Sequence, residues 1–334
     1  MSGHMRRLAV ALLMVLGTGA PLAAAQETRQ DAGQDAPVAP VTPLPVVEVA
    51  PLPVVEVAPG VWVHQAPYAL ALPRNLGFVG NAGFIIGRDG VAVVDTGGSL
   101  KAGEQLKAAV RARTDRPIRY VINTHMHPDH VLGDAAFAAP GVTFIGHRVL
   151  PEALSARAES YLEATRRLIG EDAAAGTRVV LPDVTVTESL TLDLGDRPLL
   201  LEAWPTAHTA TDLTVLDLRT GTWFLGDLLF LGHVPALDGK ALGWIALLET
   251  LKGRPAARVV PGHGPAAQPW PQAAEPTERY LRRLVADVRR MVRDGGTMRD
   301  AAREAGRAEA SDWSLFDEFN ARNATSAFHE LEWE

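Results

Sequence analysis

The chain has 334 residues, 47% hydrophobic and 21% charged, so it can bury a large core and has the composition of a globular protein. Its formal net charge of −7 argues against a nucleic-acid backbone as its main partner, because phosphate binding requires a basic surface. It contains no cysteine, which excludes a thiolate nucleophile and a thiolate metal ligand. Any metal chemistry must therefore use imidazole and carboxylate groups.

The first 25 residues have the features of a signal peptide. Arg6-Arg7 form a basic start, residues 8–16 are apolar but too few to span a bilayer, and Ala23-Ala24-Ala25 offer small residues for cleavage. No later segment is long and apolar enough to predict stable membrane insertion. We therefore expect residues 1–25 to be removed and the mature protein to be periplasmic or secreted.

Residues 26–57 are predicted to be a linker. The octapeptide Pro-Leu-Pro-Val-Val-Glu-Val-Ala occurs twice in tandem, at 43–50 and 51–58. Two prolines in such a short unit favour an extended spacer, and the second copy can lead into the first strand of the following domain. A docking segment for a partner is the alternative interpretation.

Residues 58–334 are predicted to form one domain in which strands and helices alternate. In the first half, Arg88-Asp89-Gly90 indicates a hairpin turn and Ser99 is a typical helix N-cap. The strands expected there are 61–63, 83–86, 91–94, 118–122 and 142–145. In the second half we expect helices over 151–169 and through 280–292, and strands near 184–194, 198–204, 213–219, 222–226 and 258–260. The pattern predicts an α/β (α+β) fold with two sheets face to face and helices outside.

The run His125-Met126-His127-Pro128-Asp129-His130 follows a predicted strand directly. Four of its six side chains can bind a metal, and they are too close in sequence for one tetrahedral site to use them all. His125 and His127 are two apart and can point the same way, while Pro128 turns the chain so that Asp129 and His130 can face the same pocket. The run predicts two neighbouring metal ions and metal-assisted hydrolysis, with a surface loop that binds metal adventitiously as the alternative.

Three more candidate ligands lie in turns marked by glycine or proline after predicted strands. They are His208, Asp227 and His263. Each alone would more often be a structural or surface residue. Together with the run they make seven potential ligands, which is enough for two zinc ions.

With these motifs the chain resembles the metallo-β-lactamase superfamily. The match comprises the HxHxDH run at 125–130, His208-Thr209, Gly226-Asp227, Gly262-His263-Gly264 and the hairpin that ends in Asp95-Thr96-Gly97-Gly98. The resemblance implies an αββα sandwich of two mixed β-sheets with helices on the outer faces and metals at one edge. Thr211-Asp212 departs from the many relatives that carry glycine there.

The resemblance also implies how the ligands divide. His125, His127 and His208 would hold one Zn²⁺, Asp129, His130 and His263 the other, and Asp227 would bridge them. An aspartate at the bridge is similar to glyoxalase II. The segments 232–235 and 330–334 look most like the quinoprotein relay system zinc metallohydrolases, which implies a quinoprotein dehydrogenase system as a partner.

The expected activity is that of a metal-dependent hydrolase, in which metal-bound hydroxide attacks the carbonyl of a small ester, thioester, lactone or β-lactam. Asp227 and Asp129 are the residues assigned to catalysis. Two alternatives stay open: an iron-dependent oxidoreductase on the same fold, since iron or manganese could replace zinc, and a periplasmic accessory protein.

Several other polar residues are weaker candidates. Asp95 is expected to orient a ligand imidazole or to cap a turn. His233 and Asp238 are expected to touch substrate or, more simply, to lie in a solvated loop. His147 is expected to be structural.

Overall fold

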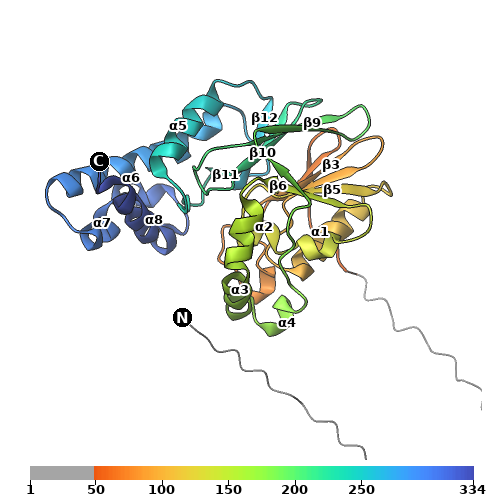
Figure 1. Cartoon of the computed structure of the whole chain (residues 1–334), viewed down its shortest axis with the longest axis horizontal. Helices are drawn as coiled ribbons and strands as arrows, with labels where there is room; N and C mark the ends of the chain where they lie inside the picture. Colours follow the sequence, from red (N-terminus) through yellow and green to blue (C-terminus); the bar gives the residue numbers. More distant parts are fainter. Residues whose placement is uncertain (1–48) are drawn as a thin grey trace, which may run out of the picture. The chain divides into compact units, whose positions relative to one another are not determined.

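The computed structural model describes residues 49–334, and within them the chain forms two β-sheets (Figure 1). The predicted signal peptide and residues 26–48 of the predicted linker lie outside the described residues. The seven-stranded sheet follows chain order and consists of β1 (Val55–Ala58), β2 (Val61–His64), β3 (Ala82–Ile86), β4 (Val91–Val94), β5 (Ile118–Ile122), β6 (Thr143–His147) and β7 (Val184–Val186). The five-stranded sheet has the order β12 (Arg258–His263), β11 (Thr222–Phe230), β10 (Leu213–Asp217), β9 (Pro198–Ala203) and β8 (Ser189–Asp193).

Both sheets are mixed. In the first, β1 to β4 pair antiparallel and β4 to β7 pair parallel. In the second, β8 to β11 pair antiparallel and β11 pairs parallel with β12. The inward side chains of both sheets form one buried cluster, to which β4 contributes Ala92 and Val94 and β10 contributes Leu213 and Val215. Since side chains alternate along a strand, Val91 and Val93 point to the opposite face.

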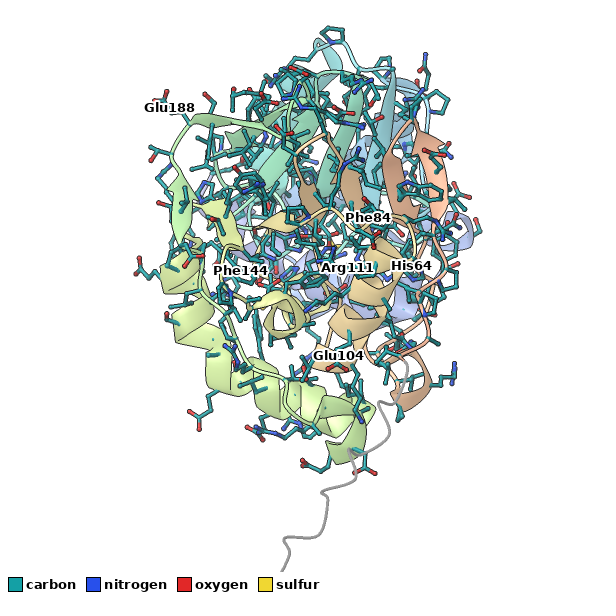
Figure 2. All side chains as sticks on the ribbon, turned by 90° about the vertical axis from the view of Figure 1, so that its right-hand side faces the viewer. His64, Phe84, Glu104, Arg111, Phe144 and Glu188 are labelled. Carbon is teal, nitrogen blue, oxygen red and sulfur yellow. The ribbon has the colours of Figure 1, made fainter. Side chains whose placement is uncertain are left out.

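Helices cover both outer faces. The α-helices are α1 (Leu100–Arg111), α2 (Pro128–Val131), α3 (Leu150–Ile169), α4 (Glu171–Ala174), α5 (Ala241–Lys252), α6 (Glu275–Arg293), α7 (Met298–Glu304) and α8 (Phe316–Leu331). Helix α1, which carries Glu104 and Arg111, lies over the face of the first sheet that presents Phe84 and Phe144 (Figure 2). It begins at Ser99, whose hydroxyl accepts a hydrogen bond from the backbone N–H of Ala102, as predicted for an N-cap.

The second sheet is covered by α5, α6 and α8. Trp223 from β11 and Val259 from β12 are buried in one cluster with Trp244 of α5, Leu284 of α6 and Ala327 of α8. With α1 on the other side, this confirms the expected αββα sandwich of two mixed sheets. None of the helices in residues 49–334 is long and apolar enough to cross a membrane.

The structure corrects one expected strand and moves the ends of several others. Residues 184–194 form two strands, because the chain crosses between β7 and β8 from one sheet to the other. β11 and β12 run past their expected ends at 226 and 260. At the other end of the domain, β1 lies inside the second octapeptide copy and pairs with β2.

Candidate metal centre

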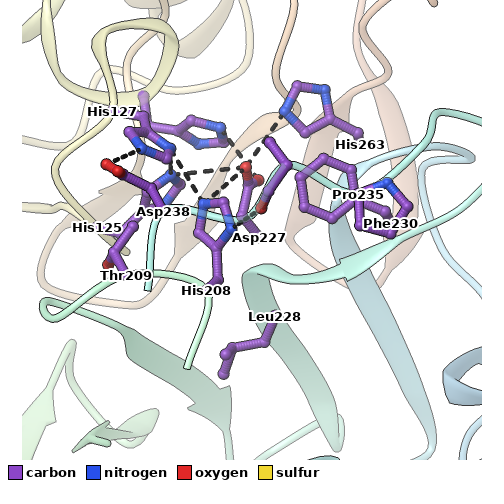
Figure 3. A network of polar contacts seen from close by, with 12 residues as sticks. His125, His127, His208, Thr209, Asp227, Leu228, Phe230, Pro235, Asp238 and His263 are labelled. Atoms are coloured by element: carbon purple, nitrogen blue, oxygen red, sulfur yellow. Dashed lines mark hydrogen bonds and ion pairs between the residues drawn. The ribbon is translucent and has the colours of Figure 1, made fainter. Parts of the chain in front are cut away.

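All seven predicted ligands meet at one edge shared by the two sheets. Figure 3 labels five of them, His125, His127, His208, Asp227 and His263. His125 and His127 follow β5, Asp129 and His130 lie in α2, His208 lies between β9 and β10, Asp227 lies in β11, and His263 ends β12. Because segments from both sheets supply ligands, the packing of the sandwich itself assembles the site.

Asp227 is not at a strand end, as the sequence predicted, but inside β11. The register between β11 and β12 shifts at Gly226, whose φ of +53° is one that glycine adopts at little cost. A Cβ at Gly226 would lie 2.7 Å from the side chain of Thr124, and one at Gly262 would lie 1.9 Å from Asp227 Oδ1. Gly262 therefore makes room for the Asp227 carboxylate, and Gly226 makes room for the side chain of Thr124.

The first group of ligands, which we call the three-histidine set, consists of His125, His127 and His208. Nδ1 of His127 lies 3.1 Å from Nε2 of His125 and 3.0 Å from Nε2 of His208. Asp227 Oδ2 lies 3.3 Å from His208 Nε2 and 3.6 Å from His125 Nε2. The four ligand atoms thus lie within 4.8 Å of one another.

The second group, the mixed set, consists of Asp129, His130 and His263. Asp129 Oδ2 lies 3.4 Å from His263 Nε2 and 3.5 Å from His130 Nε2. Asp227 also reaches this set, with Oδ1 3.2 Å from His130 Nε2 and Oδ2 3.5 Å from His263 Nε2. Its carboxylate therefore lies between the two sets, as expected for a bridging ligand.

The hydrogen bonds of the three-histidine set fix which ring nitrogens can bind a cation. His208 Nδ1 donates to the Ala236 carbonyl at 2.7 Å, and His127 Nε2 donates to Asp238 Oδ2 at 3.2 Å. In a neutral imidazole the other nitrogen then keeps its lone pair. These lone pairs face one another, an arrangement that a cation between them would stabilise.

The mixed set gives the same indication. His130 Nε2 and Asp227 Oδ1 are buried and lie 3.2 Å apart, but their geometry is not that of a hydrogen bond and neither atom has another partner. Buried polar groups normally have one. Five imidazoles and two carboxylates are also the ligands that zinc accepts when no thiolate is available. The residues present therefore fit two divalent cations.

Asp95 supports ligands of both sets. Its Oδ2 accepts hydrogen bonds from His130 Nδ1 and from the Thr124 hydroxyl, both at 2.8 Å. Because the Thr124 hydroxyl donates to Asp95, it can only accept from His125 Nδ1, which lies 3.0 Å away. Asp95 Oδ1 also accepts from the backbone N–H of Thr124 at 2.8 Å, so both of its expected roles, orienting an imidazole and capping a turn, are present.

The loop after Asp227 is not the solvated loop that the sequence favoured. Asp238 is bonded to His127, and His233 is buried beside His263 with its ring centroid 4.8 Å away. The bond to His127 had no local signal in the sequence, because Asp238 lies 111 residues further along the chain. His147 is buried outside both sets, and its Nδ1 accepts from the backbone N–H of Val149.

The loop that carries His208 is held by hydrogen bonds of Thr211 and Asp212. Both carboxylate oxygens of Asp212 accept from the backbone N–H of Thr209, and Oδ1 also accepts from its hydroxyl at 2.7 Å. Thr211 Oγ1 accepts from the backbone N–H of Met126, inside the metal run. Thr211 and Asp212 thus connect the loop that carries His208 with the run that carries His125 and His127.

Burial and charge act differently on the two sets. Burial lowers the pKa of His125 well below its ordinary value and that of His208 to about 3, although Asp227 opposes it. In the mixed set burial also lowers the pKa values, but the carboxylates outweigh it. Asp227 and Asp129 raise the pKa of His263 to about 9 and that of His130 well above its ordinary value.

The two carboxylates stay ionised. Burial alone would raise their pKa values, but the surrounding histidines outweigh it. His263 and His130 lower the pKa of Asp227 well below its ordinary value, and His130 and His263 do the same for Asp129. Both carboxylates are therefore available as ligands across the physiological pH range.

A cavity of about 360 Å³ opens onto the metal centre. His127, Asp129, Asp227 and His263 lie at its inner end. Its walls come from α3, from the segment 69–79, from the loop 230–238 and from α8. Its volume is typical of a small-molecule site.

Comparison with known proteins agrees with this geometry. The family model of the metallo-β-lactamase superfamily matches residues 76–263, a range that contains all seven candidate ligands. Among solved structures, a metallo-β-lactamase from Pontibacter korlensis aligns with a TM-score of 0.56 and 21% identity, covering 69% of this chain and 99% of that one. The DIM-1 metallo-β-lactamase aligns with a TM-score of 0.54 and 16% identity, covering 70% and 99%. At these identities the structures establish the shared fold.

One curated protein also matches locally. A linear primary-alkylsulfatase from Pseudomonas sp. is 39% identical over 51 residues, which is 15% of this chain. The match covers 10% of that protein's length, so it relates a short segment and not the whole enzyme.

Proposed function

Because the chain belongs to the metallo-β-lactamase superfamily, a family of hydrolases, we propose that it is a dinuclear zinc hydrolase of small carbonyl compounds. The reaction adds water across the acyl bond of an ester, thioester, lactone or β-lactam. It yields a carboxylate, a proton and the alcohol, thiol or amine. The observation that carries the proposal is the convergence of two ligand sets on the Asp227 carboxylate.

The side chains at the inner end of the cavity have separate tasks in this proposal. Two zinc ions would supply a water nucleophile that ionises near neutral pH and positive charge for the carbonyl oxygen. Asp227 contacts both sets and so fixes their separation. Asp129 is the more exposed carboxylate, 22% against 3% for Asp227, and it lines the cavity. Its ionised Oδ2 can accept a hydrogen bond from the attacking water and orient it.

The finer assignments are also proposals. The bridging position of Asp227 supports a site like that of glyoxalase II, and the segments 232–235 and 330–334 support the quinoprotein relay system subgroup. We propose export to the periplasm or beyond from the composition of residues 1–25, and a quinoprotein dehydrogenase system as partner from the subgroup resemblance.

Hydrolysis of a sulfate ester is a second candidate. The local match to the alkylsulfatase supports it, and the cavity next to the metal centre has the apolar walls that an alkyl chain would contact. Because that match is confined to 51 residues, we rank this reaction below acyl hydrolysis.

The test combines metal analysis with a substrate panel. The purified chain is analysed for zinc, iron and manganese, then assayed with esters, thioesters, lactones, a cephalosporin and an alkyl sulfate, with Asp227→Ala as control. Two zinc ions per chain and acyl hydrolysis that the control lacks would support the proposal. Cleavage of the alkyl sulfate alone would favour the second candidate. Iron with oxygen uptake, or metal without any turnover, would contradict both.

A further inference from the structure

Part of the lining of the cavity is apolar, and within it Ala71 packs against Ile169. Leu168 and Ile169 on α3, together with Leu70, Ala71 and Val79 from the segment before β3, line it, and we call these five residues the apolar wall. The same cavity reaches His127, Asp129, Asp227 and His263. A molecule bound at the metal centre would therefore contact the apolar wall with the part that extends away from it.

The outer end of the apolar wall is exposed. Leu168 is 54% and Leu70 39% exposed, and Tyr68, next in the chain to the lining residue Ala69, is 42% exposed. These are three of the nine large hydrophobic residues classed as exposed within residues 49–334. Leu168 and Leu70 line the cavity, and Tyr68 is the chain neighbour of a lining residue. This grouping indicates a surface that a ligand covers, because an isolated exposed leucine needs no explanation but a group at one cavity does.

The charges at the cavity do not favour an anionic tail. Among the residues that line it in the described part of the chain, Arg322 is the one lysine or arginine. Its Nη2 lies 3.4 Å from Asp238 Oδ1, and Arg157 of α3 lies 3.8 Å from Asp238 Oδ2. Asp238 thus neutralises one of these two positive charges, and the five residues of the apolar wall carry no charge that would attract a carboxylate or phosphate at the end of the substrate.

We propose that the apolar wall binds the unbranched alkyl or acyl chain of an amphiphilic substrate whose scissile group lies over the metal centre. The cleavage step in this inference rests on the proposed function, whereas the binding of the alkyl or acyl chain to the apolar wall does not. Moving one methylene group from water onto such a wall strengthens binding about fourfold. Turnover should then rise with chain length until the cavity is filled.

The test measures binding and turnover separately. Binding of 1-butanol, 1-hexanol and 1-octanol to the metal-free full chain is followed by calorimetry, since a neutral alcohol needs no metal to enter the cavity. Hydrolysis of p-nitrophenyl acetate, butyrate, hexanoate and octanoate is followed with the zinc-loaded chain. We expect affinity and kcat/KM each to rise by about fifteenfold for every two added methylenes.

Variants identify the wall. Leu168→Gln and Leu70→Gln place a polar group on exposed positions, so they should fold normally and flatten both series. Leu218→Gln is the matched control, because this leucine is 48% exposed and does not line the cavity. It follows the last residue of β10, whereas the first residue, Leu213, donates its N–H to the Thr124 carbonyl beside the metal centre.

The outcomes separate the two proposals. If affinity for the alcohols rises with chain length but no ester is hydrolysed, the inference is supported and the proposed reaction is contradicted. Hydrolysis of all esters at one rate, with no binding of octanol, would overturn the inference and leave the reaction standing. Equal chain-length dependence in wild type and Leu168→Gln would also overturn it.

Discussion

The two ligand sets of the metal centre share a bridging carboxylate but differ in charge. The three-histidine set has imidazoles held by a hydroxyl, a backbone carbonyl and the Asp238 carboxylate. The mixed set contains Asp129 and depends on Asp95. In the metal-free protein, burial keeps the pKa of His208 at about 3, whereas the carboxylates raise that of His263 to about 9. Buried histidines therefore differ between the sets: His125 and His208 are neutral and ready for a cation, whereas His130 and His263 are protonated.

The largest effect is expected at Asp227, the residue that both sets share. Asp227→Ala should lower affinity for both ions by more than about a hundredfold, since even a residue that only supports a ligand contributes ten- to hundredfold. Metal analysis after dialysis and circular dichroism would measure loss of metal and retention of the fold. Asp196→Ala, at a 77% exposed side chain, is the control that should keep both ions. If Asp227→Ala kept both ions, the prediction would be contradicted, because the two sets would then not depend on a common ligand.

The charge difference predicts that the two ions respond differently to pH. Because the pKa of His263 is about 9, an ion bound by the mixed set must displace a proton at any lower pH. The pKa of His130 is raised as well, so a second proton must leave and the affinity should fall by more than about tenfold per pH unit from pH 9 to pH 7. The ion at the three-histidine set should change little, since the pKa of His208 is about 3. Competitive metal titrations between pH 6.5 and 9 measure both. One shared pH dependence would show that the sets are not electrostatically distinct.

Asp238 allows the three-histidine set to be weakened alone. Asp238→Ala removes the carboxylate that accepts from His127 Nε2, so affinity at this set should fall about ten- to hundredfold. The mixed set should be unaffected. Stepwise metal titration measures the two affinities, and Asp312→Ala, at a 54% exposed aspartate that pairs with Arg279, is the control. Equal weakening of both ions would contradict a role confined to one set.

The smallest effect concerns a buried carboxyl behind the mixed set. Burial raises the pKa of Asp134 to about 8, although Asn123 and Thr96 donate to its Oδ1. In the unfolded chain the pKa of an aspartate is about 3.9, so the folded protein binds this proton more tightly. The free energy of unfolding therefore falls as the pH rises from about 4 towards 8. Asp134→Asn should therefore raise Tm by several degrees more at pH 9 than at pH 5. A Tm difference that does not change with pH would contradict this, and the metal titration should be unchanged.

Much of the metal centre could be predicted because its signals are local. The run from His125 to His130 places four ligands in six residues, and the turns at His208 and His263 carry glycine or proline. The hairpin around Gly90 and the helix after Ser99 were predictable for the same reason: one turn residue or one cap determines each.

The features that escaped prediction depend on contacts between distant segments. The bond between His127 and Asp238 joins residues 111 apart, and the assignment of β7 and β8 to different sheets is decided by packing and not by alternation. The burial of His233 and the apolar wall likewise arise where α8 and α3 approach the centre. A hydrophobic pattern shows which side chains are buried but not against which neighbours.

The central claim is that Asp227 joins two metal ions in one site. X-ray absorption spectroscopy of the wild-type chain loaded with zinc at pH 8 tests it most directly, because it reports both the ligands and the distance between metals. We predict two ions per chain with imidazole and carboxylate ligands and a metal–metal distance of about 3.5–4 Å. A single ion per chain, or two ions without a metal–metal signal in that range, would contradict the claim.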